Sequence, residues 1–304
     1  MELESGYKAG TVALVGRPNA GKSTLMNLLL EEKVAIVSSK PQTTRHRLVG
    51  ILSEPRGQIV FYDTPGVHRP KHRMNRHMVK AAQEALNDAD VVCLLVDASQ
   101  RHGSGDAFML EWVAQVEVPK IALLNKIDLV DKPSLLPRIA LYAERGFTEI
   151  VPISALEADG TDRVLEVLWQ LLPAGEPLYD PELLTIHPER FLVAERIREK
   201  VLERTREELP FSIAVVVDGW EERSAGLVAI YASILTERDS QRKIVLGAGG
   251  RQIKAIGTAA RRDLEAFLGR RVFLDLTVRV AKDWRENARI LSQLERAPFD
   301  VTLE

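Results

Sequence analysis

The chain has 304 residues, of which 45% are hydrophobic and 28% charged, the balance of a globular protein long enough for two domains. A net charge of −2 excludes a chain-wide cationic surface, so any nucleic-acid contact must come from a local patch. The single cysteine, Cys93, excludes an intrachain disulfide and indicates a reducing compartment. The first ten residues lack the apolar core of a signal peptide, and no run reaches the ~18 apolar residues of a membrane span. We therefore expect a cytoplasmic protein.

The first half of the sequence alternates short apolar runs with segments of helical periodicity. The apolar runs predict six strands: Thr11–Val15, Arg47–Leu52, Gln58–Tyr62, Val91–Val96, Lys120–Leu124 and Glu149–Ile153. The intervening segments predict helices at Gly21–Leu30, Met78–Leu86 and Asp106–Val116, and a closing helix at Asp162–Leu172. This alternation is typical of an α/β fold in which helices cover both faces of a mostly parallel sheet.

A proline-rich stretch separates this half from the second. Four prolines lie in the sixteen residues from Pro173 to Pro188, which excludes regular structure and indicates a linker. The elements predicted beyond it follow the order helix, strand, strand, helix, helix, strand: Ala194–Leu209, Ser212–Asp218, Gly226–Thr236, Gln241–Leu246, Arg251–Leu268 and Arg271–Val280. We therefore expect a first domain at 1–175, a linker at 176–190, a second, α+β domain at 191–283 and a tail at 284–304.

The strongest motif follows the first predicted strand and opens a helix, as a phosphate-binding P-loop must. It reads Gly16-Arg17-Pro18-Asn19-Ala20-Gly21-Lys22-Ser23. Its glycines allow backbone N–H groups to surround phosphates, and the helix N-terminus favours negative charge. Lys22 is expected to reach the β- and γ-phosphates, and the Ser23 hydroxyl to bind Mg²⁺.

A second motif, Asp63-Thr64-Pro65-Gly66, follows the third predicted strand. A carboxylate at this position can hold Mg²⁺ through water, and the Gly66 N–H can contact the γ-phosphate, so the loop would sense that phosphate. A threonine between the P-loop helix and the second strand should complete the Mg²⁺ shell. Thr43 and Thr44 are the candidates, and we favour Thr44.

A third motif, Asn125-Lys126-Ile127-Asp128, predicts specificity for guanine. The Asp128 carboxylate can accept two hydrogen bonds, from N1–H and the 2-amino group, and adenine would leave it unpaired. The Lys126 stem can lie along the base, and Ser154-Ala155-Leu156 would offer backbone N–H groups to O6. The predicted nucleotide site therefore comprises the P-loop and Thr24, Asp63, Thr64, Pro65, Gly66 and Val67, and Asn125, Lys126, Asp128, Ser154, Ala155 and Leu156.

Val67 occupies the position at which many signalling GTPases carry a water-orienting glutamine, and valine cannot orient water. Hydrolysis must then be slow or use another device. The Asn19 carbonyl could help to hold a potassium ion where an arginine finger acts in other GTPases; alternatively, Asn19 only braces the loop. We assign catalytic roles to Lys22, Asn19 and Gly66.

The second half contains a glycine loop, Gly247-Ala248-Gly249-Gly250, between two predicted helices. A G-x-x-G turn lets a nucleotide backbone approach the main chain, as in KH domains, although alone it is often only a helix cap. Eight basic and two acidic residues lie between Arg242 and Arg271, which supplies the local patch. The predicted RNA-binding residues are Lys243, Gly247, Ala248, Gly249, Gly250, Arg251 and Lys254.

Taken together, these motifs resemble the Era family of bacterial GTPases, and the resemblance extends to the Pro41–Arg45 loop, the linker and Ile244–Gly257. It implies a Ras-like P-loop GTPase domain with a six-stranded sheet, joined to a type II KH domain. It also implies binding to the 3′ end of small-subunit (16S) ribosomal RNA, a role in maturing that subunit, and contact with the inner face of the membrane. Ala248 departs from the family, in which this loop commonly carries a basic residue.

Two other functions fit the first domain: a tRNA-modification GTPase and a membrane-signalling switch whose second domain binds protein. No chemistry for tRNA modification is evident after Gly175. We expect a monomer that binds GTP or GDP with Mg²⁺, and a K⁺ ion if the Asn19 hypothesis holds.

Overall fold

The computed structural model describes residues 6–40, 42–66, 73–205, 209–224 and 226–296. The chain folds into two compact units, with the boundary between Ile186 and His187. Within the described residues, no helix combines the length and the apolar character needed to cross a membrane.

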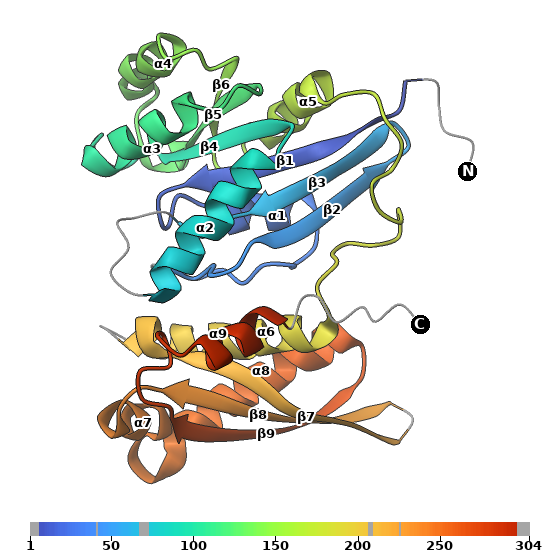
Figure 1. The fold of residues 1–304 in the computed structure, drawn as a ribbon, viewed down its shortest axis with the longest axis vertical. Helices are drawn as coiled ribbons and strands as arrows, with labels where there is room; N and C mark the ends of the chain where they lie inside the picture. Colours follow the sequence, from blue (N-terminus) through green and yellow to red (C-terminus); the bar gives the residue numbers. More distant parts are fainter. Residues whose placement is uncertain (1–5, 41, 67–72, 206–208, 225, 297–304) are drawn as a thin grey trace. The chain divides into compact units, whose positions relative to one another are not determined.

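The first unit is built on a six-stranded sheet with the order β2-β3-β1-β4-β5-β6 (Figure 1). Its strands are β1 (Lys8–Gly16), β2 (Leu48–Glu54), β3 (Gly57–Asp63), β4 (Val91–Asp97), β5 (Lys120–Asn125) and β6 (Glu149–Ile153). All neighbouring pairs are parallel except β2 and β3, which form a hairpin. The six predicted strands and the mostly parallel sheet are thus confirmed. Because the parallel strands end at one edge of the sheet, the loops that follow them gather there.

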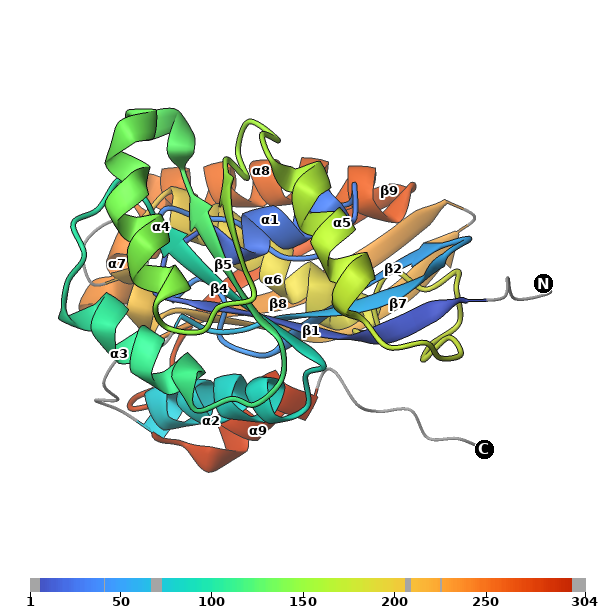
Figure 2. The ribbon, with the colours of Figure 1, turned by 90° about the horizontal axis from the view of Figure 1, so that it is seen from above.

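Helices cover both faces of this sheet. They are α1 (Lys22–Leu29), α2 (Arg73–Asn87), α3 (Ser104–Ala114), α4 (Leu136–Ala143) and α5 (Thr161–Leu171). Helices α1 and α5 lie on one side of the sheet and α2 and α3 on the other (Figures 1 and 2). Apolar residues of α2, α3 and α4 pack with alternate residues of the strands in one core. The sequence did not predict α4, which follows two short 3₁₀ turns, Ile127–Leu129 and Lys132–Leu135.

The proline-rich segment packs on the edge of the first unit, which differs from the predicted linker at 176–190. The side chain of Gln58 in β3 is fully buried and forms hydrogen bonds with the main chain of this segment. Its Oε1 accepts from the N–H groups of Leu178 and Tyr179 at 2.8 and 2.9 Å, and its Nε2 donates to Tyr179 O at 2.9 Å. Ile51 N–H also donates to Leu184 O at 2.9 Å. Prolines exclude regular structure here, but they do not exclude fixed docking.

The second unit has the predicted element order, followed by one helix, α9, that the sequence did not predict. It comprises α6 (Glu189–Glu203), a 3₁₀ turn (Leu209–Ser212), β7 (Ala214–Ser224), β8 (Leu227–Thr236), α7 (Asp239–Leu246), α8 (Arg251–Leu268), β9 (Arg271–Val280) and α9 (Ala288–Arg296). The sheet order is β7-β8-β9, antiparallel and then parallel. Helices α6 and α8 pack together against one face of this sheet over a single apolar core. This is the α+β arrangement predicted for the second domain.

Three features of this unit differ from the predicted boundaries: helix α6, the end of strand β7 and the start of the tail. Strand β7 continues to Ser224, beyond the predicted end at Asp218. Helix α6 begins directly after Pro188 and ends at Glu203, so it lies several residues earlier than the predicted Ala194–Leu209. Trp284, predicted to open a tail, is completely buried and its indole N–H donates to Ser212 O at 2.9 Å. The part of the tail at 297–304 lies outside the described residues.

Candidate functional site

The P-loop connects β1 to α1, and its glycines are required by close neighbours. A Cβ atom at Gly16 would lie 2.5 Å from the carbonyl oxygen of Leu95, and one at Gly21 would lie 2.1 Å from Asn125 Nδ2. Gly21 also has φ 99°, in the left-handed region, where it caps α1. Any side chain at either position would therefore push the loop away from β4 or from the guanine motif.

Lys22 is buried at the start of α1, beneath the loop. Its Nζ donates to the carbonyl oxygens of Gly16 at 3.3 Å and Arg17 at 3.1 Å. Burial lowers the pKa of Lys22 to about 8, and the nearby Asp63 carboxylate opposes this effect. The Lys22 side chain therefore lies inside the loop, where a bound phosphate would favour the charged ammonium and so raise its pKa.

Three oxygen ligands converge beside Lys22. Ser23 Oγ lies 2.5 Å from Asp63 Oδ2 and 2.9 Å from Thr44 Oγ1, and the Thr44 hydroxyl donates to Asp63 Oδ2 at 3.1 Å. Burial raises the pKa of Asp63, against the opposing effects of Lys22, Ser23 and Thr44. Asp63 Oδ1 is buried without a hydrogen-bond partner. A buried carboxylate beside two hydroxyls is the hard-oxygen set that suits Mg²⁺. Thr43 is outside this cluster and donates to Lys40 O at 2.7 Å.

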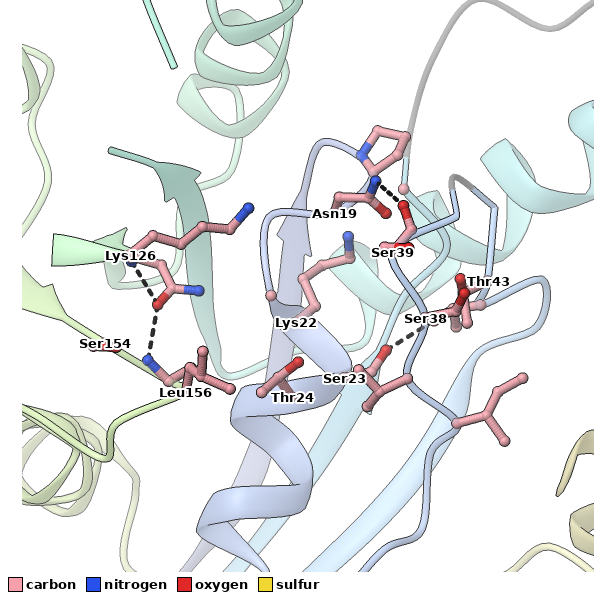
Figure 3. Close-up of a pocket in the computed structure, with 18 of the residues that line it drawn as sticks. Asn19, Lys22, Ser23, Thr24, Ser38, Ser39, Thr43, Lys126, Ser154 and Leu156 are labelled. Atoms are coloured by element: carbon pink, nitrogen blue, oxygen red, sulfur yellow. Dashed lines mark hydrogen bonds between the residues drawn. The ribbon is translucent and has the colours of Figure 1, made fainter. Parts of the chain in front are cut away.

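The guanine motif lies at the other end of the cavity (Figure 3). Asn125 Nδ2 donates to Ala20 O at 2.7 Å, and its Oδ1 accepts from the N–H groups of Lys126 and Ala155 at 2.8 and 2.9 Å. Asn125 thus ties the P-loop, its own motif and the loop after β6 together. The Ser154 hydroxyl donates to Asp128 Oδ1 at 2.6 Å, which orients that carboxylate.

Two of the predicted O6 donors are already engaged within the protein. The N–H of Ser154 donates to Asp159 O, and that of Ala155 donates to Asn125. The structure therefore brings this loop to the cavity, but it does not present those two N–H groups to a ligand.

The cavity has a volume of about 390 Å³ and brings most of the predicted residues together. Those that line it are Pro18, Asn19, Gly21, Lys22, Ser23, Thr24, Thr44, Gly66, Asn125, Lys126, Asp128, Ser154, Ala155 and Leu156. The predicted residues outside the lining are Gly16, Arg17, Ala20, Asp63, Thr64 and Pro65. Val67 lies outside the described residues, so its place in the nucleotide site, at a position where a water-orienting glutamine is absent, stays a prediction.

Several lining residues were not predicted. The segment Ile36–Ser39, together with Gln42 and Leu129, completes the cavity wall. Asn19, which has φ 63°, donates from Nδ2 to Ser39 O at 2.8 Å and so joins the P-loop to this segment (Figure 3). The segment carries no motif of its own, and only its position between α1 and Thr44 indicated that it could reach the site.

Lys126 has a further partner that the sequence did not indicate. Its Nζ lies 2.5 Å from Asp97 Oδ2 at the end of β4. The other oxygen of Asp97 accepts from the N–H and hydroxyl of Ser99 at 2.9 and 2.6 Å. This ion pair fixes the direction of the Lys126 stem along the cavity wall.

The glycine loop of the second unit joins α7 to α8. Gly247, Gly249 and Gly250 have φ of 70°, 59° and 75°, all in the left-handed region. A Cβ at Gly247 would lie 2.7 Å from Gln252 Cβ, whereas a Cβ at Gly249 would meet nothing within 4 Å. The main chain of this loop is therefore accessible to a ligand. Lys243, Ala248, Arg251 and Lys254 are all exposed around it.

Comparisons with known proteins agree with both units. Residues 11–126 match the family described as 50S ribosome-binding GTPase, and residues 208–285 match the KH domain family. The GTPase Era of Geotalea uraniireducens (strain Rf4) is 48% identical over 291 residues, which cover 95% of this chain and 98% of that protein. The GTPase Era of Heliobacterium modesticaldum (strain Ice1) is 43% identical over 298 residues, which cover 98% and 99%.

Two solved structures are similar over nearly the whole chain. One is a crystal structure of Era in complex with MgGDPNP and nucleotides 1506–1542 of 16S ribosomal RNA, with a TM-score of 0.92, 38% identity, and coverage of 95% of this chain and 98% of that one. The other is a single-residue variant of Aquifex aeolicus Era bound to GDP·AlF₄⁻, with a TM-score of 0.90, 38% identity, and coverage of 94% and 98%.

Proposed function

The chain belongs to the Era family of GTPases, and we propose that it couples GTP binding and hydrolysis to recognition of the 3′ end of 16S ribosomal RNA during maturation of the small ribosomal subunit. The observation that carries the proposal is the presence, in one chain, of a complete guanine and phosphate cavity and an open glycine loop flanked by exposed basic residues. Support for the RNA comes from the related Era that was crystallised with 16S ribosomal RNA.

In this proposal, each part of the cavity holds one part of the nucleotide. Asp128, oriented by Ser154, pairs with the guanine edge, and the Lys126 stem packs on the base. Lys22 and the loop N–H groups hold the phosphates. Ser23, Thr44 and Asp63 would hold Mg²⁺, which neutralises charge on the phosphate oxygens when it is bound.

The γ-phosphate is sensed, in this proposal, by the loop that ends at Gly66. A Cβ at Gly66 would lie 2.6 Å from the Cα and N atoms of Pro18, so this glycine packs directly on the P-loop. In this proposal the Gly66 N–H, held beside the P-loop, contacts the γ-phosphate.

We further propose that Asn19 contributes a carbonyl ligand to a potassium ion. Its Nδ2 atom donates to Ser39 O, so a second carbonyl oxygen lies beside the Asn19 amide. The proposal predicts turnover that is low in sodium chloride and higher in potassium chloride at matched ionic strength. Asn19→Ala should lose that difference. Equal turnover in the two salts would leave Asn19 only a brace for the loop.

The RNA proposal is tested by crosslinking the protein to cellular RNA with GDP and with a non-hydrolysable GTP analogue. Enrichment of the 3′ end of 16S ribosomal RNA, with a yield that depends on the nucleotide, supports it. Recovery of transfer RNA, or of protein without RNA, would instead favour a tRNA-modification GTPase or a membrane-signalling switch.

Peripheral membrane contact, a cytoplasmic location and a monomeric state belong to the same proposal. Flotation with anionic vesicles tests the contact, and sedimentation velocity tests the monomer.

A further inference from the structure

Arg17, the second residue of the P-loop, directs its side chain away from the cavity. Its guanidinium lies 2.8 Å from Asp106 Oδ2, near the start of α3. The Asp106 carboxylate is almost buried, and its Oδ2 also accepts the N–H of Gly103 at 2.9 Å. The partner of Arg17 is therefore fixed by the backbone of α3, while Arg17 itself belongs to the loop that surrounds phosphate.

The start of α3 leaves room for this arginine. A Cβ at Gly105 would lie 2.8 Å from Arg17 Nε and 3.1 Å from its Cζ. The backbone at Gly105 is outside the left-handed region, so the conformation itself does not require glycine. The absence of a side chain at Gly105 is thus explained by the guanidinium that lies over it.

The tip of the P-loop is held on three sides by its consecutive residues. Arg17 contacts α3, Pro18 packs against Gly66, and Asn19 donates to Ser39 O. The Arg17 carbonyl oxygen is also an acceptor for Lys22 Nζ. A shift of Arg17 would therefore move both the loop tip and an acceptor of the phosphate-binding lysine.

We propose that Arg17 is a positioning residue, and that its clasp with Asp106 across Gly105 holds the P-loop open for phosphate. The proposal rests on the nucleotide site described above and adds to it a side chain that points away from the cavity. A loop whose N–H groups already point inward loses less conformational freedom when phosphate binds. Once phosphate is bound, its own contacts hold the loop, so the clasp acts on affinity and not on the chemical step.

The sharpest test is Gly105→Ala, because the new methyl group meets only the flexible end of Arg17 in the contacts nearest to it. We expect the dissociation constants of fluorescent GDP and of a non-hydrolysable GTP analogue to rise about five-fold, the effect of a charged hydrogen bond discounted for the exposure of Arg17. KM for GTP should rise equally with kcat unchanged. The melting temperature without nucleotide should not fall, because alanine favours the helix over glycine.

Introducing Gly105→Ala into an Arg17→Ala background shows whether the substitution acts through the Arg17–Asp106 ion pair or directly on helix α3. Arg17→Ala alone should weaken binding to a similar extent, and adding Gly105→Ala should then change nothing, because the obstructed side chain is absent. Arg163→Ala, which removes an exposed pair with Glu166 on α5, is the matched control and should leave affinity unchanged.

Three outcomes would overturn the proposal. One is an unchanged dissociation constant in Arg17→Ala. Another is an equal effect of Gly105→Ala in both backgrounds, which would assign the effect to α3 itself. The third is a fall in kcat as large as the fall in kcat/KM, which would place Arg17 in the transition state and not in positioning.

Discussion

Replacing both inner glycines of the second unit's loop, Gly249→Asp with Gly250→Asp, should abolish tight RNA binding without unfolding the protein. A Cβ at Gly249 meets no atom within 4 Å, and one at Gly250 meets only Ile253 Cγ2 at 3.9 Å. The cost is the left-handed backbone, about 1–2 kcal/mol for each residue. Two aspartates at the N-terminus of α8 recover part of that cost through the helix dipole.

The loss of RNA affinity follows from charge. A carboxylate about 5 Å from a phosphate costs ~0.8 kcal/mol at the dielectric constant of water and ~3 kcal/mol at an effective value of 20. Two carboxylates therefore weaken binding at least about ten-fold. For the parent, four clamped nucleotides predict a log–log salt slope of about −3 from this loop alone, and the double variant should lose that part of the slope.

The assay is a fluorescence titration of a single-stranded 16S 3′-end fragment at several salt concentrations, with GTP binding measured in parallel. Gly269→Asp is a matched control, since Gly269 has φ 63°, open space at Cβ, and a position at the other end of the 18-residue α8, about 27 Å away. Gly249→Asn adds a side chain of nearly the same size as aspartate without its charge, so comparing it with the aspartate variant distinguishes the effect of size from that of charge. If the double variant keeps the RNA affinity and the salt slope of the parent, the glycine loop does not bind the RNA backbone as in KH domains. That result would favour a protein partner for this unit.

Three further predictions concern the first unit. Asp128→Asn should lower GTP affinity by on the order of 10⁴-fold and shift preference to XTP, measured by competition binding. Gln58→Ala should lower the free energy of unfolding by about 2–4 kcal/mol in urea titrations, since it removes three hydrogen bonds between a buried side chain and the main chain of the proline-rich segment, whereas an unchanged midpoint would show that segment to be undocked. Burial alone would raise the pKa of Asp97, but hydrogen bonds from Lys126 and Ser99 leave this pKa below its ordinary value. Its carboxylate therefore stabilises the fold above about pH 4 and ceases to do so as the pH falls, so Asp97→Asn should flatten the acid limb of melting temperature against pH.

The sequence predicted the features whose causes are local. The strand ends and the glycine turn of the nucleotide site are set within a few residues, and this is why the P-loop and the guanine motif were placed correctly at the ends of β1 and β5. Helix α4 was missed because Pro133 and Pro137 flank its start and its eight residues give too short a periodic pattern.

Contacts between distant segments could not be predicted in the same way. Arg17 and Asp106 are separated by 89 residues, and Gln58 and Tyr179 by 121. The P-loop pattern assigned Arg17 to the nucleotide, because a motif records which residues form a loop and not where each side chain points. Only the approach of α3 explains its direction.

Gln58 nevertheless left a signal in the sequence. It lies in a strand whose seven residues are all buried, so its amide must find both donors and acceptors among its neighbours. The hairpin supplies one partner, Ser53 Oγ at 3.1 Å, and the other bonds go to the main chain of the proline-rich segment. A polar residue inside a predicted buried strand thus indicates an undetected neighbour. Here that neighbour is the segment read as a linker, and its docking assigns residues up to Ile186 to the GTPase unit.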